Sequence, residues 1–309
     1  MNDQSIRRIG TVVALCTTVA WVFLLATLVV SVTAHGQDAR SLLAHEARLR
    51  TQLADNAFQR SIAIESSESS SMLKGDVYAI VAMPYSLVGQ ALGNMDNWCD
   101  VLILHLNVKN CRARGAGTSG TLGVAIGSRF DQPLADAYRV DFTYRTATNR
   151  PDYLQVLLSA NEGPLGTKDF RIVFEAAPLG TTRSFVHMSY AYGFGAMALF
   201  AMRTYLGTIG RNKVGFSVAE PKNGDVPIVY RGGVRGLVER NAMRYFLAID
   251  AFLGAYALPV ADQQEKRLDD WFTSVERYPR QLHELERDVY LSMKRREITR
   301  QKSTSTNAD

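Results

Sequence analysis

Side chains that could hold a metal ion or act as nucleophiles are spread thinly over the 309 residues. The five histidines, at positions 35, 45, 105, 187 and 283, show no metal-ligand spacing. HExxH, CxxC and GxSxG are absent, which removes the strongest metal and nucleophile signatures. Triads are recognised by geometry rather than by order, so enzymes as a class are not excluded. The sequence therefore predicts no metal site, no cofactor and no assignable catalytic residue.

The segment from Gly115 to Gly120 matches GxGxxG by letter. A dinucleotide site needs this motif after a buried strand and at the start of a helix. Here a strand-like stretch, residues 122–126, follows the glycines instead of a helix. We therefore predict a glycine-rich hairpin connection.

The charge balance disfavours nucleic acid as a partner. The net charge is +5 at pH 7, which is modest for this length, and no basic stripe alternates with strand aromatics. The hydrophobic content of 47% is enough to bury a core and excludes a disordered chain.

The apolar character is concentrated first at the N-terminus. Residues 9–34 contain no charged side chain or histidine, Arg7 and Arg8 precede them, and the run ends at Val32-Thr33-Ala34. A positive start, an apolar centre and a small-residue exit are the parts of a secretory signal. We prefer export with cleavage near Ala34, and an uncleaved anchor stays open because typical signal cores are shorter. Either reading predicts a periplasmic protein, or one attached to the inner membrane and facing the periplasm.

Export changes the interpretation of two cysteines. Cys99 and Cys111 form an even pair in an oxidising compartment and would close a short loop. We predict a disulfide that ties a helix to the strand after it, ahead of the alternative of two buried thiols.

The middle of the chain alternates apolar and polar residues. A helix is expected over 39–58, a serine-rich turn or linker over 66–71, and a proline-led helix over 85–92. Period-two patterns then predict an antiparallel meander with one face on a core. The predicted strands include residues 76–81, 101–110, 140–145, 170–175 and 186–192.

The last third has helical periodicity. We expect helices over 233–257 and 262–278 and a further helix from Pro279. The tail from Lys294 onward is basic and then rich in serine and threonine, which predicts disorder. Lys294, Arg295 and Arg296 are candidate contacts with anionic lipid.

Several stretches resemble the START or polyketide-cyclase-like (SRPBCC) superfamily. They are residues 75–85, 91–92, 96–99 and 235–241, which correspond to a first strand, two short helices with Trp98 as a packing residue, and the start of a long helix. The resemblance covers about residues 66–258 and implies an α+β helix-grip fold, a curved antiparallel sheet wrapped on a long C-terminal helix. The predicted organisation is a signal or anchor over 1–34, a helix and linker over 35–65, the START-like domain over 66–258, and a helical extension with a disordered tail over 259–309. The extra N- and C-terminal helices depart from the superfamily pattern.

The resemblance also implies a hydrophobic cavity between sheet and helix. The residues expected to line it are Tyr144, Met188, Tyr190, Tyr192, Arg244, Tyr245, Ile249 and Phe252. Arg244 would orient the polar end of a ligand. The alternative is that Arg244 and Asp250 lie at the solvent edge of the helix.

The segment from Tyr190 to Gly210 has Arg203 as its only charge. It is read either as a buried helix that closes the sheet or as a methionine-rich lid over a lipid pocket. In the second reading Met197 and Phe200 touch a membrane and Arg203 lies near a headgroup.

These observations predict an envelope protein that binds or transfers a lipid or another large hydrophobic molecule. The partners expected are that ligand and a membrane surface, and no protein partner is assigned. Two alternatives stay open: a cyclase- or aromatase-like enzyme of the same superfamily, and a non-catalytic envelope scaffold. We favour binding over catalysis, because no pair of titratable groups is placed in the cavity by sequence alone.

Overall fold

The computed structural model describes residues 38–208, 210–218 and 229–306. The predicted signal or anchor, residues 1–34, lies outside the described residues. Residues 38–309 form one compact unit by themselves. Among the described residues, no helix has both the length and the apolar character needed to cross a membrane.

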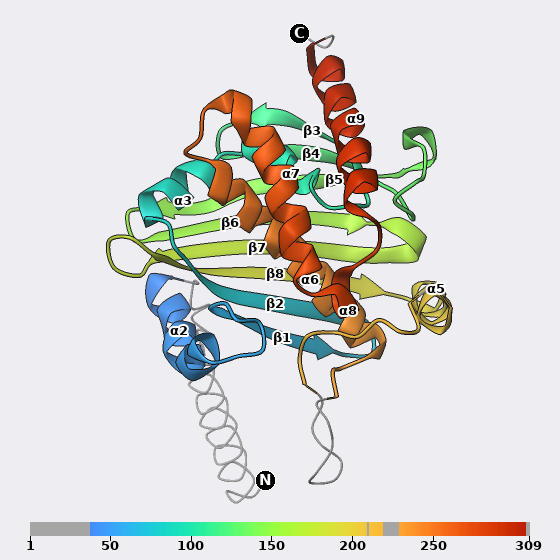
Figure 1. The fold of residues 1–309 in the computed structure, drawn as a ribbon, viewed down its shortest axis with the longest axis horizontal. Coiled ribbons are helices and arrows are strands. Elements are labelled where there is room, and N and C mark those ends of the chain that lie inside the picture. The colour runs from blue at the N-terminus through green and yellow to red at the C-terminus, as the bar shows by residue number, and fades with distance from the viewer. Residues whose placement is uncertain (1–37, 209, 219–228, 307–309) are drawn as a thin grey trace, which may run out of the picture. The chain divides into compact units, whose positions relative to one another are not determined.

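The centre of this unit is an eight-stranded antiparallel sheet with the order β1-β2-β8-β7-β6-β5-β4-β3. Strands β3 to β8 follow one another as a meander, as the alternating patterns predict. The hairpin of β1 and β2 extends the sheet beyond the last strand, because β2 pairs with β8. The sheet is curved (Figure 1). The strands are β1 (Ile62–Glu68), β2 (Met72–Val81), β3 (Val108–Ala116), β4 (Ser119–Ile126), β5 (Tyr138–Arg150), β6 (Tyr153–Glu162), β7 (Thr167–Pro178) and β8 (Ser184–Phe194).

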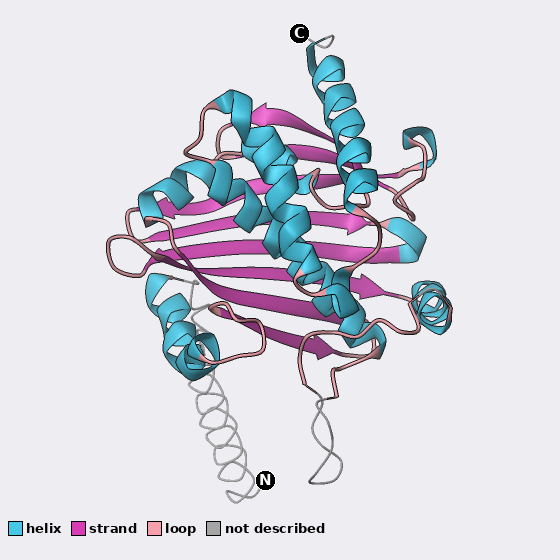
Figure 2. Ribbon diagram, viewed as in Figure 1, coloured by secondary structure: helices cyan, strands magenta, loops and turns pink. Residues whose placement is uncertain are grey.

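Helices cover the face of the sheet that is turned to the viewer in Figures 1 and 2. The long helix α6 packs on β2 and β8, and α7 packs on α6. At Gly75 of β2 an added Cβ would lie 3.0 Å from Cβ of Ala242 and 3.1 Å from the carbonyl oxygen of Val238, so a side chain there would push α6 away. The helices are α2 (Ala39–Ala54), α3 (Tyr85–Leu92), α4 (Asp96–Leu102), α5 (Ala196–Gly207), α6 (Gly233–Ala255), α7 (Val260–Glu276), α8 (Pro279–Leu282) and α9 (Arg287–Thr306), with short 3-10 turns η1 (Leu134–Asp136) and η2 (Pro164–Gly166).

The element order confirms the predicted α+β helix-grip fold, with a sheet that wraps on a long helix near the C-terminus. Alternate residues of β2 face opposite layers: Val77 joins the core under α6, whereas Tyr78 joins a smaller core with Phe185. Leu42, Leu49 and Leu53 of α2 cover this second core. The sheet is therefore buried on both faces near β1, β2 and β8.

Two predictions near the start of the domain are wrong. The serine-rich stretch 66–71 is a linker only at 69–71, because residues 62–68 form β1 and pair with β2. Backbone pairing with a long neighbouring strand overrides the turn preference of serine. Residues 101–110 are not one strand either: α4 continues to Leu102, and β3 starts at Val108. The apolar run there is buried from all sides, so periodicity could not separate strand from helix.

The C-terminal tail also differs from the prediction. Residues 294–306 belong to α9 and are not disordered, and the predicted helix from Pro279 is two helices separated at residues 283–286. The Lys294 side chain is fully buried and bonds the carbonyl oxygens of His105 and Val108 at 2.8 Å. It therefore is not a contact for anionic lipid. Strand β6, which no pattern singled out, completes the meander.

The predicted disulfide is confirmed. Cys99 in α4 is bonded to Cys111 in β3, twelve positions further along the chain. It joins a helix to the following strand, as expected. The GxGxxG letters at 115–120 form the hairpin between β3 and β4, with Gly115 and Gly117 at positive φ.

Candidate functional site

Most of the residues predicted to line a cavity lie together in the main core. Tyr144, Met188, Tyr190, Tyr192, Ile249 and Phe252 belong to one buried cluster, and Tyr245 packs against it. The ring centroid of Tyr190 lies 5.3 Å from that of Tyr245 and 5.6 Å from that of Tyr192. These side chains contact one another, and none of them lines the surface pockets described below. Their role as ligand contacts stays a prediction.

Arg244 does not lie with this group. It is buried, not at the solvent edge as one reading expected, and its Nη2 lies 2.7 Å from a carboxylate oxygen of Glu284. The same atom bonds the carbonyl oxygen of Leu282. Asp250 is half-buried and pairs with Arg60 at 2.7 Å. Arg244 therefore joins α6 to the segment around α8.

A buried polar network occupies the opposite face of the sheet, near α2. The ring of His187 lies between two carboxylates, with Nε2 2.9 Å from Asp76 and Nδ1 2.6 Å from Glu175. Tyr153 donates its hydroxyl to Glu175, and Tyr78 stacks on the His187 ring at 4.4 Å. Both nitrogens of the ring are thus engaged by partners that are themselves buried.

Charges within this network stabilise one another. Burial opposes the charge on His187, but hydrogen bonds to Asp76 and Glu175 outweigh it and raise the pKa of the histidine. Burial likewise disfavours charge on both carboxylates, yet the contact with His187 keeps the pKa of each below its ordinary value. An imidazolium with both N–H groups donated has no lone pair to act as a base. The network is therefore suited to holding β2, β7 and β8 together rather than to catalysis.

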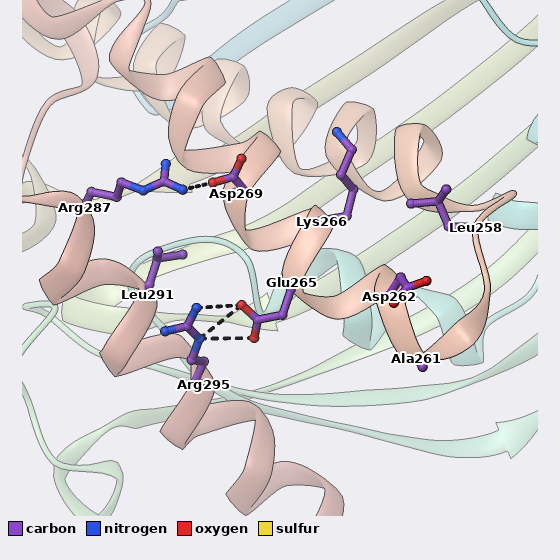
Figure 3. Close-up of a pocket in the computed structure, with 9 residues that line it drawn as sticks. All are labelled: Leu258, Ala261, Asp262, Glu265, Lys266, Asp269, Arg287, Leu291 and Arg295. Carbon is purple, nitrogen blue, oxygen red and sulfur yellow. Dashed lines mark hydrogen bonds and ion pairs between the residues drawn. The ribbon is translucent and has the colours of Figure 1, made fainter.

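A surface pocket between α7 and α9 has a volume of about 470 Å³. Figure 3 shows two pairs of its charged groups facing each other across the two helices. Arg295 pairs with Glu265 at 2.7 Å, and Arg287 pairs with Asp269. Because these charges already compensate one another, the pocket has little to offer an ionic ligand.

Helix α5 is the most exposed apolar element at the edge of the domain. It projects beyond the end of β8 (Figure 1). Only Ala198 and Met202 are buried, while Met197 and Phe200 are 74% and 73% exposed. The reading of this segment as a buried helix that closes the sheet is therefore wrong. The turn η2, which contacts α5, adds the exposed Leu165.

A second pocket, of about 590 Å³, lies between α5 and the start of α6. Apolar wall residues are Leu199, Leu206 and Val234, and the charged ones are Arg203, Arg231, Arg235 and Glu68. Arg235 is held by Ser66, to whose hydroxyl and carbonyl oxygens it donates. Within the described ranges, none of these three arginines forms an ion pair. The pocket thus carries excess positive charge beside an exposed apolar helix.

A further arginine lies deeper, under α5. Arg240 of α6 is 1% exposed, and its Nε and Nη2 have no hydrogen-bond acceptor among the described residues. Its Nη1 donates to the carbonyl oxygen of Val214 at 3.4 Å, and Tyr205 is a further polar neighbour. Burial, and next the charge of Arg244, lower the pKa of Arg240, while Tyr205 of α5 has the opposite influence.

The sequence pointed to Met197, Phe200 and Arg203 of α5 and to Arg244 of α6. It did not point to Arg231, Arg235 or Arg240. Arg231 and Arg235 flank Gly232 and Gly233, and these glycines mark the start of the helix. Arg240 and Arg244 are one helical turn apart in a mostly apolar helix. Two arginines four positions apart in a mostly apolar helix indicate that at least one of them is buried. Only the fold shows which of the two forms an ion pair.

No family model matches the chain, and no curated protein is similar in sequence. Solved structures with a similar arrangement include norcoclaurine synthase from Thalictrum flavum, at 13% identity and a TM-score of 0.34, over 46% of this chain and 82% of that one. Human StAR-related lipid transfer protein 5 has 11% identity and a TM-score of 0.31, over 55% and 88%. A conserved protein of unknown function from Enterococcus faecalis has 6% identity and a TM-score of 0.31, over 78% and 91%.

The fold of this chain is a curved antiparallel sheet wrapped on the long helix α6. Its assignment as a helix-grip fold rests on the chain's own sheet order and on the position of α6. Similarity at these identities concerns the arrangement of elements and says nothing about which ligand this chain binds.

Proposed function

We propose that the protein binds a lipid, or another large amphiphile with an anionic head group, at the surface of a membrane in the cell envelope. The observation that carries this proposal is the pocket beside α5. Arg203, Arg231 and Arg235 line this pocket, and the helix that forms one of its walls, α5, also carries the exposed side chains of Met197 and Phe200.

The chemistry of this edge fits an interface between water and lipid. Met197 and Phe200 are three positions apart, so they project from the same side of α5. Apolar side chains on one side of a helix insert into the boundary between headgroups and acyl chains, and nearby arginines attract anionic lipid. Burial of a phenylalanine side chain contributes about 1.5–3 kcal/mol, and each arginine near the surface about 1 kcal/mol.

The test is co-sedimentation of residues 38–309 with vesicles of phosphatidylglycerol and phosphatidylcholine. We expect Phe200→Asp to weaken binding by at least tenfold, because it replaces an inserted ring by a charge that anionic lipid repels. Val260→Asp is the matched control, since Val260 is 85% exposed at the start of α7, outside this edge. If Phe200→Asp binds like the wild type, α5 is not the membrane contact and the proposal is wrong.

Lipid extraction from the purified protein, followed by mass spectrometry, tests the ligand directly. We expect an anionic amphiphile to accompany the wild-type chain. A variant in which Arg203 and Arg231 are both replaced by Ser should lose it, because two of the three positive charges of the pocket are removed. Recovery of the same amphiphile from that variant would argue against this pocket as the head-group site.

A further inference from the structure

Arg240 is buried, and no carboxylate among the described residues forms an ion pair with it. Near it lie two other cations, Arg244 and Lys213, and the carboxylate of Glu284. Glu284 already pairs with Arg244, and Lys213 donates to the carbonyl oxygen of His283. The neighbouring Glu239 points elsewhere, to the backbone N–H groups of Phe216 and Ser217. A buried cation without an anion is costly, and proteins keep such groups where they serve binding.

Helix α5 covers this guanidinium. Tyr205 of α5 interacts with Arg240, and Met202 of α5 lies with its sulfur 3.5 Å from the hydroxyl oxygen of Tyr192. Leu206, the residue after Tyr205, lines the pocket between α5 and α6 that contains Arg203, Arg231 and Arg235, called the arginine pocket below. Arg240 itself does not line that pocket, and it interacts with Tyr205 of α5 and with Tyr192, the residue that Met202 of α5 contacts.

The contacts that hold α5 in place are few. It buries only Ala198 and Met202, and an added Cβ at Gly195 or Gly207, at its two ends, would meet nothing within 4 Å. Glycine offers the widest range of backbone conformations at both ends. A helix with little buried surface opens at a low cost in free energy.

We propose that Arg240 is an inner binding site for the anionic group of an amphiphile, which reaches it when α5 moves away from α6. This inference rests on the proposed function and adds to it a specific receiving group. The outer arginines Arg203 and Arg231 attract the head group first. Arg240 then forms the charge-assisted hydrogen bonds for which its Nε and Nη2 are available.

The test compares full-length wild type with Arg240→Met, using decyl phosphate below its micelle concentration as the probe. Both chains carry the same N-terminal segment, so any binding by that segment cancels. We expect Arg240→Met to weaken decyl phosphate binding at least tenfold in calorimetric titration. Decanol, which has the tail without the charge, should distinguish the two chains little. Arg211→Met, which removes an exposed charge from the nearby loop, is the matched control.

Two outcomes would overturn the inference. One is decyl phosphate affinity that Arg240→Met leaves unchanged. The other is wild-type affinity for inorganic phosphate equal to that for decyl phosphate, which would make a free anion the ligand. Vesicle co-sedimentation of the wild type is measured in parallel. The proposed function fails if the wild type does not sediment, whereas this inference fails alone if it sediments and Arg240→Met binds decyl phosphate normally.

Stability supplies an independent readout. Arg240→Met removes an uncompensated buried charge and should unfold at a higher temperature than the wild type. Arg244→Met leaves Glu284 without its partner and should unfold at a lower one. A purely structural role for Arg240 predicts that both variants lose stability, and that result would contradict the proposal.

Discussion

At the scale of single residues, buried charges of this protein fall into two kinds. His187 is enclosed by Asp76 and Glu175, so its charge is compensated on both sides. Arg240 has no such enclosure, and two of its nitrogens lack acceptors among the described residues. Groups of the first kind stabilise the fold, and a group of the second kind costs stability and is retained for binding. Partner geometry, rather than burial, separates the two.

The network around His187 predicts a pH dependence of stability. Because the pKa of His187 is raised in the folded state above its ordinary 6.5, the folded chain holds a proton that the unfolded chain releases. Its contribution is complete below pH 6.5 and is lost as the pH rises through the folded pKa. The lowered pKa values of Asp76 and Glu175 make their contribution complete above their ordinary values of 3.8 and 4.5 and lost in stronger acid.

Nuclear magnetic resonance of the histidine rings checks this prediction. We expect the His187 ring to titrate above 6.5, and this titration should be absent in His187→Gln. That variant removes the cation between two buried carboxylates and leaves only Lys74, 3.0 Å from Asp76, so its free energy of unfolding should fall by about 3–5 kcal/mol. A His187 ring that titrates below 6.5 would mean that burial outweighs the carboxylates.

At the scale of elements, two connections hold β3 to the rest of the domain. The disulfide joins β3 to α4, which precedes it in the chain, and the C-terminal helix α9 packs on β3. Lys109 of β3 and Lys294 of α9 share the carboxylate of Glu297, at 3.1 and 2.8 Å. The edge strand β3 is thus covered by a helix, which protects it from pairing with another chain.

The disulfide prediction is quantitative. Replacing Cys99 and Cys111 together by Ala should lower the free energy of unfolding by about 3 kcal/mol, because the unfolded chain regains the entropy of an open loop. Urea denaturation with and without reductant measures this difference. Reductant should shift the midpoint of the wild type and leave the double variant unmoved. Equal stability of wild type and variant in the absence of reductant would contradict the prediction.

Glu297 pairs with both buried lysines, Lys109 and Lys294. Burial lowers the pKa of Lys294 to about 8, although the charge of Glu297 counteracts this shift. Glu297→Gln should therefore cost about 3–5 kcal/mol at neutral pH, since it leaves two buried ammonium groups unpaired. The folded chain binds fewer protons than the unfolded one between pH 8 and 10.5, so stability should rise with pH across that range. Denaturation curves of wild type and variant at about pH 7 and about pH 9.5 check both statements.

At the scale of the whole molecule, α5 and the arginine pocket make one edge of the domain different from the rest. This edge carries the exposed side chains of Met197 and Phe200 on α5, and three arginines without an ion pair among the described residues. Between α7 and α9, by contrast, two pairs of opposite charges compensate one another (Figure 3). An orientation that places this edge on a membrane leaves the paired surfaces in water.

This asymmetry predicts salt-sensitive membrane binding. Three arginines contribute about 3 kcal/mol to binding of anionic vesicles, and salt screens this attraction. Raising the salt from about 0.05 M to about 0.5 M should release most of the wild-type chain from anionic vesicles. The residual binding should match that to zwitterionic vesicles, which depends on Phe200 and Met197. Binding that does not change with salt would show that the arginines take no part.

The sequence by itself determined the elements whose periodicity and boundary residues agree. The proline-led helix at 85–92, the meander, the long helix from Gly233 and the cysteine pair could all be predicted, because each rests on local geometry or on a pairing within a few turns of chain. It also identified Met197, Phe200 and Arg203 as an unusual apolar segment with one charge.

Only the tertiary structure decided which charges are paired and which surfaces are covered. The sequence places Lys294 in a solvated basic tail. In the fold it is buried, because its ammonium group pairs with Glu297 and donates to the carbonyl oxygens of the distant residues His105 and Val108. Arg244 and Arg240 cannot be told apart in the sequence, yet Glu284 forms an ion pair with Arg244 and acts on Arg240 only through its charge. The energy of a charge depends on partners that the chain brings together from far apart, and composition and spacing do not contain that information.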